Sequence, residues 1–165
     1  MVHNENDDMI LPHHGVFTLK VFDKDGNLKH QQETENIITN AGVYELGDLL
    51  IGAHTNTINY LSCGTGTAAP AVGDTDLNVT CQQGGSSSAA QVRKQVTSRT
   101  RTTNTLTFSR LLASGDYDRP ATISELGVWF APQATGDLFA RGLLNTTVTL
   151  ASGDTATLTY GILLR

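Results

Sequence analysis

The chain has 165 residues, a formal net charge of −5 and only 16% charged and 6% aromatic residues. Its hydrophobic content of 39% argues against wholesale disorder, and no apolar run approaches the length of a membrane-spanning helix. Twenty-three threonines and 16 glycines favour strands and turns, which excludes an all-helical bundle, while the acidic balance argues against a general nucleic-acid-binding protein.

The first 14 residues are predicted to form a flexible N-terminal arm. They are polar and acidic, show no periodicity, and lack the pattern of a signal peptide. Regular alternation begins at Gly15, so we expect one folded domain over residues 15–165.

Two elements open this domain. Residues 16–22 alternate between apolar and polar side chains, and an Asp-Gly turn at residues 25–26 predicts that residues 28–34 return as the second strand of a hairpin. A short helix is expected next, capped by Asn40, with its apolar residues at helical spacing and its end near Gly52.

The rest of the chain has the pattern of strands joined by turn-rich loops. Loops are expected at residues 64–75 and, with a flexible Gly-Ser composition, at 84–88. The predicted strands cover residues 57–63, 92–101, 103–109, 121–130, 138–144, 147–150 and 155–164. The predicted fold class is therefore mainly β, a β-sandwich or jelly-roll-like domain with one short α-helix and a flexible N-terminal arm.

Charge is unevenly distributed along the chain. Six acidic residues and no basic residue lie between His30 and Val92, whereas six basic residues lie between Arg93 and Arg119. The two halves either neutralise each other within one fold or form complementary patches across a subunit contact. The second interpretation gives these candidate subunit-contact residues, with two histidines of the arm: His13, His14, Arg93, Lys94, Arg99, Arg101 and Arg110.

No pattern of catalytic or metal-binding residues stands out. The sequence has no Gly-x-Ser-x-Gly elbow, and adjacent histidines on a flexible arm are poorly preorganised for a metal ion. Cys63 and Cys81 lack the paired spacing of a zinc site and are expected to be free thiols. We therefore expect no enzyme, no catalytic residue, no cofactor and no metal, and a core position for Trp129, the only tryptophan.

Three segments in this order resemble a family of tailed-bacteriophage virion structural proteins, described as head decoration or cement proteins and as tail-fibre or baseplate components. The first is NIITNAG at residues 36–42, before the Leu-rich helix; the second is YLSCGTGTAAPAVGDTDL at residues 60–77. The third is ISELGVWF at residues 123–130, followed by LFAR and a final strand that begins with Gly-Asp-Thr. The resemblance covers nearly the whole chain from Gly15 onward, and departs from the family at the Gly84–Ser88 insert and in the acidic arm.

The resemblance implies a non-enzymatic structural component of the phage particle, foremost a capsid decoration or cement protein that binds across neighbouring capsid subunits. The implied partners are the major capsid protein or other virion subunits, with homo-oligomers, no direct nucleic-acid contact and no membrane. The implied location is the virion, after synthesis in the host bacterial cytoplasm. Alternatives are a tail-associated protein of the fibre base, collar or baseplate, and a carbohydrate-binding module that uses exposed Tyr44, Tyr60 or Tyr117.

Overall fold

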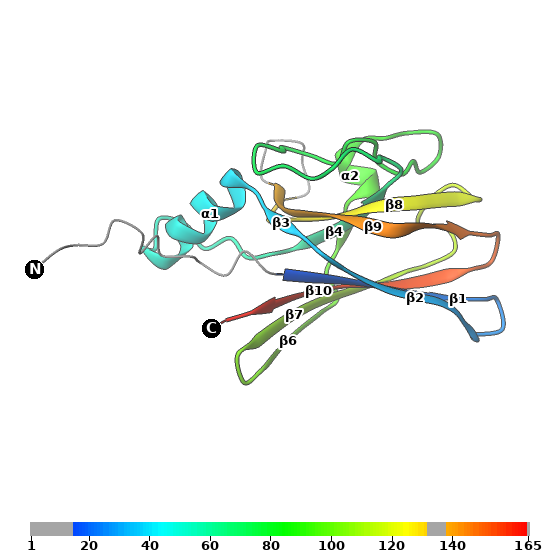
Figure 1. Cartoon of the computed structure of the whole chain (residues 1–165), viewed down its shortest axis with the longest axis horizontal. Coiled ribbons are helices and arrows are strands. Elements are labelled where there is room, and N and C mark those ends of the chain that lie inside the picture. The colour runs from blue at the N-terminus through cyan, green and yellow to red at the C-terminus, as the bar shows by residue number, and fades with distance from the viewer. Residues whose placement is uncertain (1–14, 132–137, 165) are drawn as a thin grey trace, which may run out of the picture.

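The structure is a computed structural model that describes residues 15–131 and 138–164. It consists of two five-stranded antiparallel sheets stacked face to face, with a helix at one end, as expected for a β-sandwich (Figure 1). In the first sheet the strand order is β2 (Leu28–Glu35), β1 (Gly15–Phe22), β10 (Thr155–Leu163), β7 (Thr105–Leu112) and β6 (Ser98–Thr102). In the second sheet it is β3 (Ile37–Ile38), β9 (Leu138–Leu150), β8 (Ala121–Trp129), β4 (Tyr60–Gly64) and β5 (Lys94–Gln95).

The opening hairpin forms as its alternation predicts. Phe17, Leu19 and Val21 of β1 point into the core and are almost completely buried. The turn to β2 is tied by the carboxylate of Asp23, which accepts the backbone N–H groups of residues 25 and 27, and Gly26 supplies the required φ of 85°. Since alternation and turn residues agree, the sequence specifies this register strongly.

Strand β8 is buried on both faces. Ile123, Leu126 and Val128 join the main core between the sheets. The opposite face carries Glu125 and Trp129, and both are 0% exposed because the long loop between β4 and the short helix α2 (Ala89–Val92) lies over this sheet (Figure 1). The second sheet is therefore enclosed from both sides, which explains the continuous apolar run of β8.

Helix α1 (Asn40–Leu50) closes one end of the sandwich. Its N-cap is Thr39, one residue before the predicted cap, since the Thr39 hydroxyl accepts the N–H of Gly42 at 3.0 Å and donates to the carbonyl of Leu138. Asn40 is instead the first helical residue, and its N–H donates to the carbonyl of Val72 at 2.8 Å. These bonds connect the start of the helix to β9 and to the loop of residues 65–88 that lies over the second sheet, which we call the covering loop.

Several strand boundaries differ from the prediction: β4 begins at Tyr60 instead of residue 57, and β7 covers Thr105–Leu112 instead of residues 103–109. The largest differences are one split strand and one fusion. The expected strand 92–101 is split into the end of α2, then β5 in the second sheet and β6 in the first. The chain changes sheets at Val96, whose N–H donates to the carbonyl of Asn59. Conversely, the expected strands 138–144 and 147–150 are one strand, β9.

No described helix has the length and apolar character needed to cross a membrane.

Candidate interaction site

Two of the predicted contact residues, Arg93 and Lys94, are held inside the fold. The Arg93 guanidinium stacks 4.4 Å from the ring centre of Trp129 and lies 3.3 Å from a carboxylate oxygen of Asp76. The Lys94 ammonium lies 3.5 Å from Asp116. Both residues are buried, so their charges are matched within the chain and are not presented to a partner.

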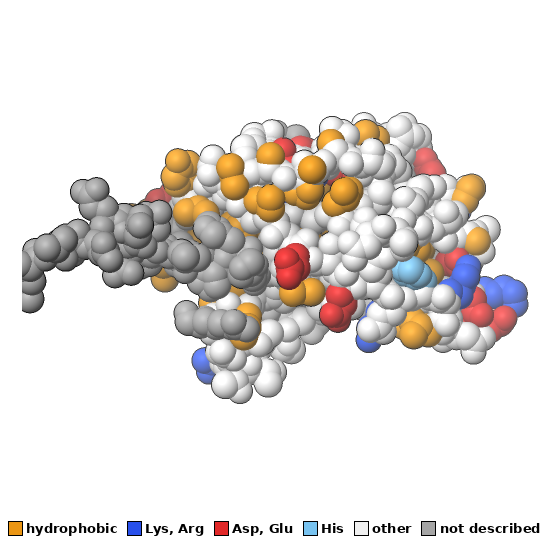
Figure 2. Space-filling model, viewed as in Figure 1, with side chains coloured by type: hydrophobic (Ala, Val, Ile, Leu, Met, Phe, Trp, Pro, Cys, Tyr) orange, Lys and Arg blue, Asp and Glu red, His pale blue; other side chains and the backbone are white. Residues whose placement is uncertain are grey.

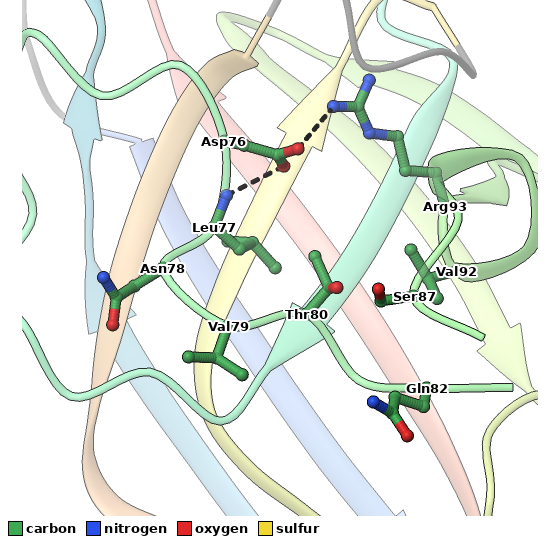
Figure 3. Close-up of a pocket in the computed structure, with 9 residues that line it drawn as sticks. All are labelled: Asp76, Leu77, Asn78, Val79, Thr80, Gln82, Ser87, Val92 and Arg93. Atoms are coloured by element: carbon green, nitrogen blue, oxygen red, sulfur yellow. Dashed lines mark hydrogen bonds and ion pairs between the residues drawn. The ribbon is translucent and has the colours of Figure 1, made fainter. Parts of the chain in front are cut away.

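Arg93 also borders a polar pocket of about 340 Å³ beneath the covering loop (Figure 3). The close-up shows the Asp76 carboxylate between the Arg93 guanidinium and the backbone N–H of Leu77. The nine residues drawn include the hydroxyls of Thr80 and Ser87 but no histidine, lysine or cysteine. The one carboxylate among these nine residues is that of Asp76, which already accepts from the Leu77 N–H and pairs with Arg93.

The remaining basic candidates of the described chain lie in the first sheet. Arg99 and Arg101 are exposed on β6, an edge strand in which all five residues are exposed. Arg110 is partly exposed and lies 3.6 Å from Asp116. His13 and His14 fall outside the described residues. Of the predicted contact residues that the structure describes, Arg99 and Arg101 are therefore the two whose side chains face solvent.

The strongest buried ion pair joins Glu125 of β8 to Arg141 of β9, and the sequence reasoning did not single out either residue. The Glu125 carboxylate accepts from the Arg141 side chain at 2.7 Å and from the backbone N–H groups of Gly66, Asn78 and Val79 at 2.8–3.1 Å. With four such bonds, the carboxylate anchors two separate points of the covering loop, at Gly66 and at residues 78–79, to the sheet.

Arg141 extends this network to the middle of the loop. It donates to the carboxylate of Asp74 at 2.8 Å and to the carbonyl of Ala68 at 2.9 Å. Burial lowers its pKa, but the hydrogen bonds and charges of Asp74 and Glu125 outweigh this and leave the pKa above its usual value. A carboxylate so fully occupied is a structural anchor rather than a general acid or base. The sequence signal that could have found this pair is a single charged residue in each of two neighbouring strands, β8 and β9.

The two cysteines face each other across antiparallel backbone in the core. Their Sγ atoms are 3.4 Å apart, both residues are buried, and both thiols are free. Burial raises the pKa of Cys63 well above its usual value, and the neighbouring Cys81 adds to the shift. Because the thiolate is the reactive form, the Cys63 thiol is unsuited to nucleophilic catalysis.

The tyrosines do not form the platform expected for a carbohydrate-binding module. Tyr117 is only 2% exposed and its hydroxyl donates to the carbonyl of Val92, so its predicted exposure was wrong. Tyr60 packs partly buried beside Trp129, which lies in the core as predicted. Tyr44 alone of the three is exposed, at 72%.

Among the described residues no group of three or more potential ligands could hold a metal ion.

An apolar groove of about 320 Å³ lies at the end of the sandwich that carries α1. One wall is the inner face of α1, with Val43, Leu46 and Leu49, and the opposite wall is formed by Leu106 of β7 and Ile162 of β10. Arg99 borders the groove on the side of β6. The groove thus joins the helix to the basic edge strand.

An exposed apolar surface continues from the groove onto α1. Leu50 and Ile51, at the end of the helix, are 77% and 79% exposed, and Tyr44 lies on the same helix. Figure 2 shows hydrophobic side chains gathered over the upper layer of the molecule, while acidic and basic side chains concentrate at the far end, around the β1–β2 turn. We call Leu50 and Ile51 the apolar helix tip. Exposed apolar clusters of this kind are typical of protein–protein contacts.

Comparisons of the chain with protein-family models, with curated proteins and with solved structures found no match.

Proposed function

We propose that the chain is a non-enzymatic structural protein of a bacteriophage particle, a capsid decoration or cement protein that binds across neighbouring capsid subunits. The resemblance of three segments to such proteins motivates the proposal. In the fold, residues 36–42 lead into α1, residues 60–77 form β4 and most of the loop over the second sheet, and residues 123–130 form its central strand. The three segments thus all belong to the second sheet or to the helix and the loop that are attached to it.

The observation that carries the proposal is the surface at one end of the sandwich. Helix α1, which carries the apolar helix tip, and β6, which carries the exposed arginines, both border the apolar groove, and β6 is an edge strand among the described strands of the first sheet. Aromatic, aliphatic and arginine side chains are those that carry most binding energy in protein interfaces. A rigid sandwich with one such end is suited to contact between subunits, with the major capsid protein as the proposed partner and the virion as the proposed location.

Weak binding at each site is sufficient in this role. Many copies on one lattice, and contacts between neighbouring copies of the chain, add avidity without new contacts to the capsid. The N-terminal arm supplies a further segment for contact with a neighbour.

Replacing Leu50 and Ile51 together with serine is expected to weaken binding to particles that lack the protein at least tenfold, because two exposed apolar side chains leave the contact. Deleting residues 2–14 is expected to weaken binding as well while the domain stays folded. Co-sedimentation of the purified variants with such particles measures both effects.

The matched control is Lys24→Glu, which changes an exposed side chain in the β1–β2 turn, at the other end of β1 from the groove. Its binding should equal that of the unmodified chain. Equal occupancy for the Leu50/Ile51 variant would remove the apolar helix tip from the contact, and equal occupancy for the deletion would remove the arm.

A further inference from the structure

The apolar groove is a binding site without an assigned occupant. It holds about 320 Å³ between side chains that are almost entirely apolar, such as Leu46, Leu106 and Ile162. Apolar surface of this kind is left in contact with water only at a cost of roughly 25 cal/mol per Å². The shape, a channel between a helix and the ends of two strands, suits an extended peptide segment with apolar side chains.

One cross-strand row connects the start of β1 to the basic rim of this groove. Gly15 is the register partner of Ile162, Ile162 that of Leu106, and Leu106 that of Arg101. Register partners carry their side chains on the same face of the sheet, so Arg101 lies on the groove side, as Arg99 does. Two intervening strands separate Gly15 from Arg101, a distance of about 15 Å.

The 14 residues before Gly15 have the length to follow this row. Five residues lie between Met9 and Gly15, and the six Cα–Cα steps that join the two reach up to about 20 Å when extended, which exceeds the width of the row. The chain enters the sandwich at the mouth of the groove, because Gly15 lies opposite Ile162, a residue of the groove wall. A segment attached at this point is present at millimolar effective concentration.

The sequence of that segment matches the groove in order as well as in length. Residues 9–11 are Met-Ile-Leu, the longest apolar run of the arm, and Pro12 after them favours an extended backbone at Leu11. Asp7 and Asp8 stand on the far side of the run from Gly15. With residues 9–11 over the groove, the two carboxylates reach the edge of β6, where Arg99 and Arg101 are exposed.

We propose that the groove is a peptide-binding site and that its occupant is residues 7–12 of the same chain. Met9, Ile10 and Leu11 fill the apolar channel, and Asp7 and Asp8 pair with the arginines of β6. This inference concerns the isolated chain and goes beyond the proposed function, since it holds wherever the chain acts. In a particle-bound protein, a partner therefore contacts an end of the sandwich whose groove is already filled by the arm.

The test uses the full chain and a fluorescent synthetic peptide of residues 2–14. The unmodified chain should take up little peptide, because its own segment fills the groove. A full-length variant with Met9, Ile10 and Leu11 all changed to serine should bind the peptide at least 30-fold more tightly than the unmodified chain does, measured by fluorescence anisotropy. The same triple change in the peptide should abolish this binding.

A charge exchange tests the polar end of the site. In the triple-serine chain, Arg101→Glu should weaken peptide binding about fivefold, and a peptide with Asp7→Lys and Asp8→Lys should recover the loss, whereas Lys24→Glu should have no effect. Failure of the triple-serine chain to bind the peptide would overturn the proposal. A dimer of the unmodified chain that the triple substitution dissociates, detected by light scattering, would also overturn it by making a second copy the donor. Neither experiment uses particles, so a failure of this proposal can be distinguished from a failure of the proposed function.

Discussion

Replacing Glu125 with alanine is expected to lower the free energy of unfolding by about 3–5 kcal/mol. The substitution leaves Arg141 buried with only Asp74 as a charged partner, and it leaves the backbone N–H groups of residues 66, 78 and 79 without their acceptor. Each unsatisfied buried donor carries a desolvation cost of about 1–3 kcal/mol. Urea denaturation followed by tryptophan fluorescence measures the loss, since Trp129 lies four residues from Glu125 on the same face of β8.

The matched control for this prediction is Glu35→Ala, which removes an exposed carboxylate from β2 and should change stability by no more than about 0.5 kcal/mol. A double-mutant cycle with Arg141→Ala should show a coupling energy above about 1 kcal/mol, because the two side chains are in direct contact. A loss below about 1 kcal/mol for Glu125→Ala would mean that the covering loop does not depend on this anchor.

Gly42→Ala is expected to destabilise the protein by about 2–3 kcal/mol, because helix α1 approaches β9 too closely for a side chain. A Cβ at this position would lie 2.3 Å from the carbonyl oxygen of Phe139, which is backbone and has little freedom to move. The helix would have to shift away from the strand, and the groove wall formed by Val43 and Leu46 would shift with it. Thermal and urea unfolding measure the stability change.

The same helix provides an opposite control. A Cβ added at Gly47 meets nothing within 4 Å, so Gly47→Ala should stabilise the protein by about 0.5–1 kcal/mol through helix propensity alone. The two substitutions add the same methyl group and are expected to act with opposite signs. If Gly42→Ala were neutral or stabilising, the close packing of α1 against β9 would be wrong.

The sequence predicted the fold best where one physical signal acted alone. Alternation of apolar and polar residues fixed the strand and register of β1, and an Asp-Gly turn fixed its hairpin. The prediction was least accurate at residues 92–101. Val92 and Val96 are both buried, as the alternation predicts, but Val92 is the last residue of α2 and Val96 lies where the chain crosses from one sheet to the other. Local periodicity reports which side chains are buried and not which sheet buries them.

The surface was harder to predict than the core. Basic residues close in sequence were grouped as one contact candidate, although Arg93 is stacked on Trp129 and Arg101 is exposed. Long basic side chains take either role according to partners that are distant in sequence, here Asp76 across the covering loop. The groove could not be foreseen for the same reason, since its walls come from α1, β7 and β10, which meet only in the folded chain.

The proposed role as a capsid decoration protein is tested most directly by the copy number of the chain in purified particles, measured by quantitative peptide mass spectrometry against the major capsid protein. We predict a ratio of about one, or a simple large fraction of it, because a decoration protein follows the capsid lattice. A count on the order of a dozen or fewer would contradict the capsid position and place the chain in the tail, collar or baseplate. Absence from the particles would contradict the virion role itself.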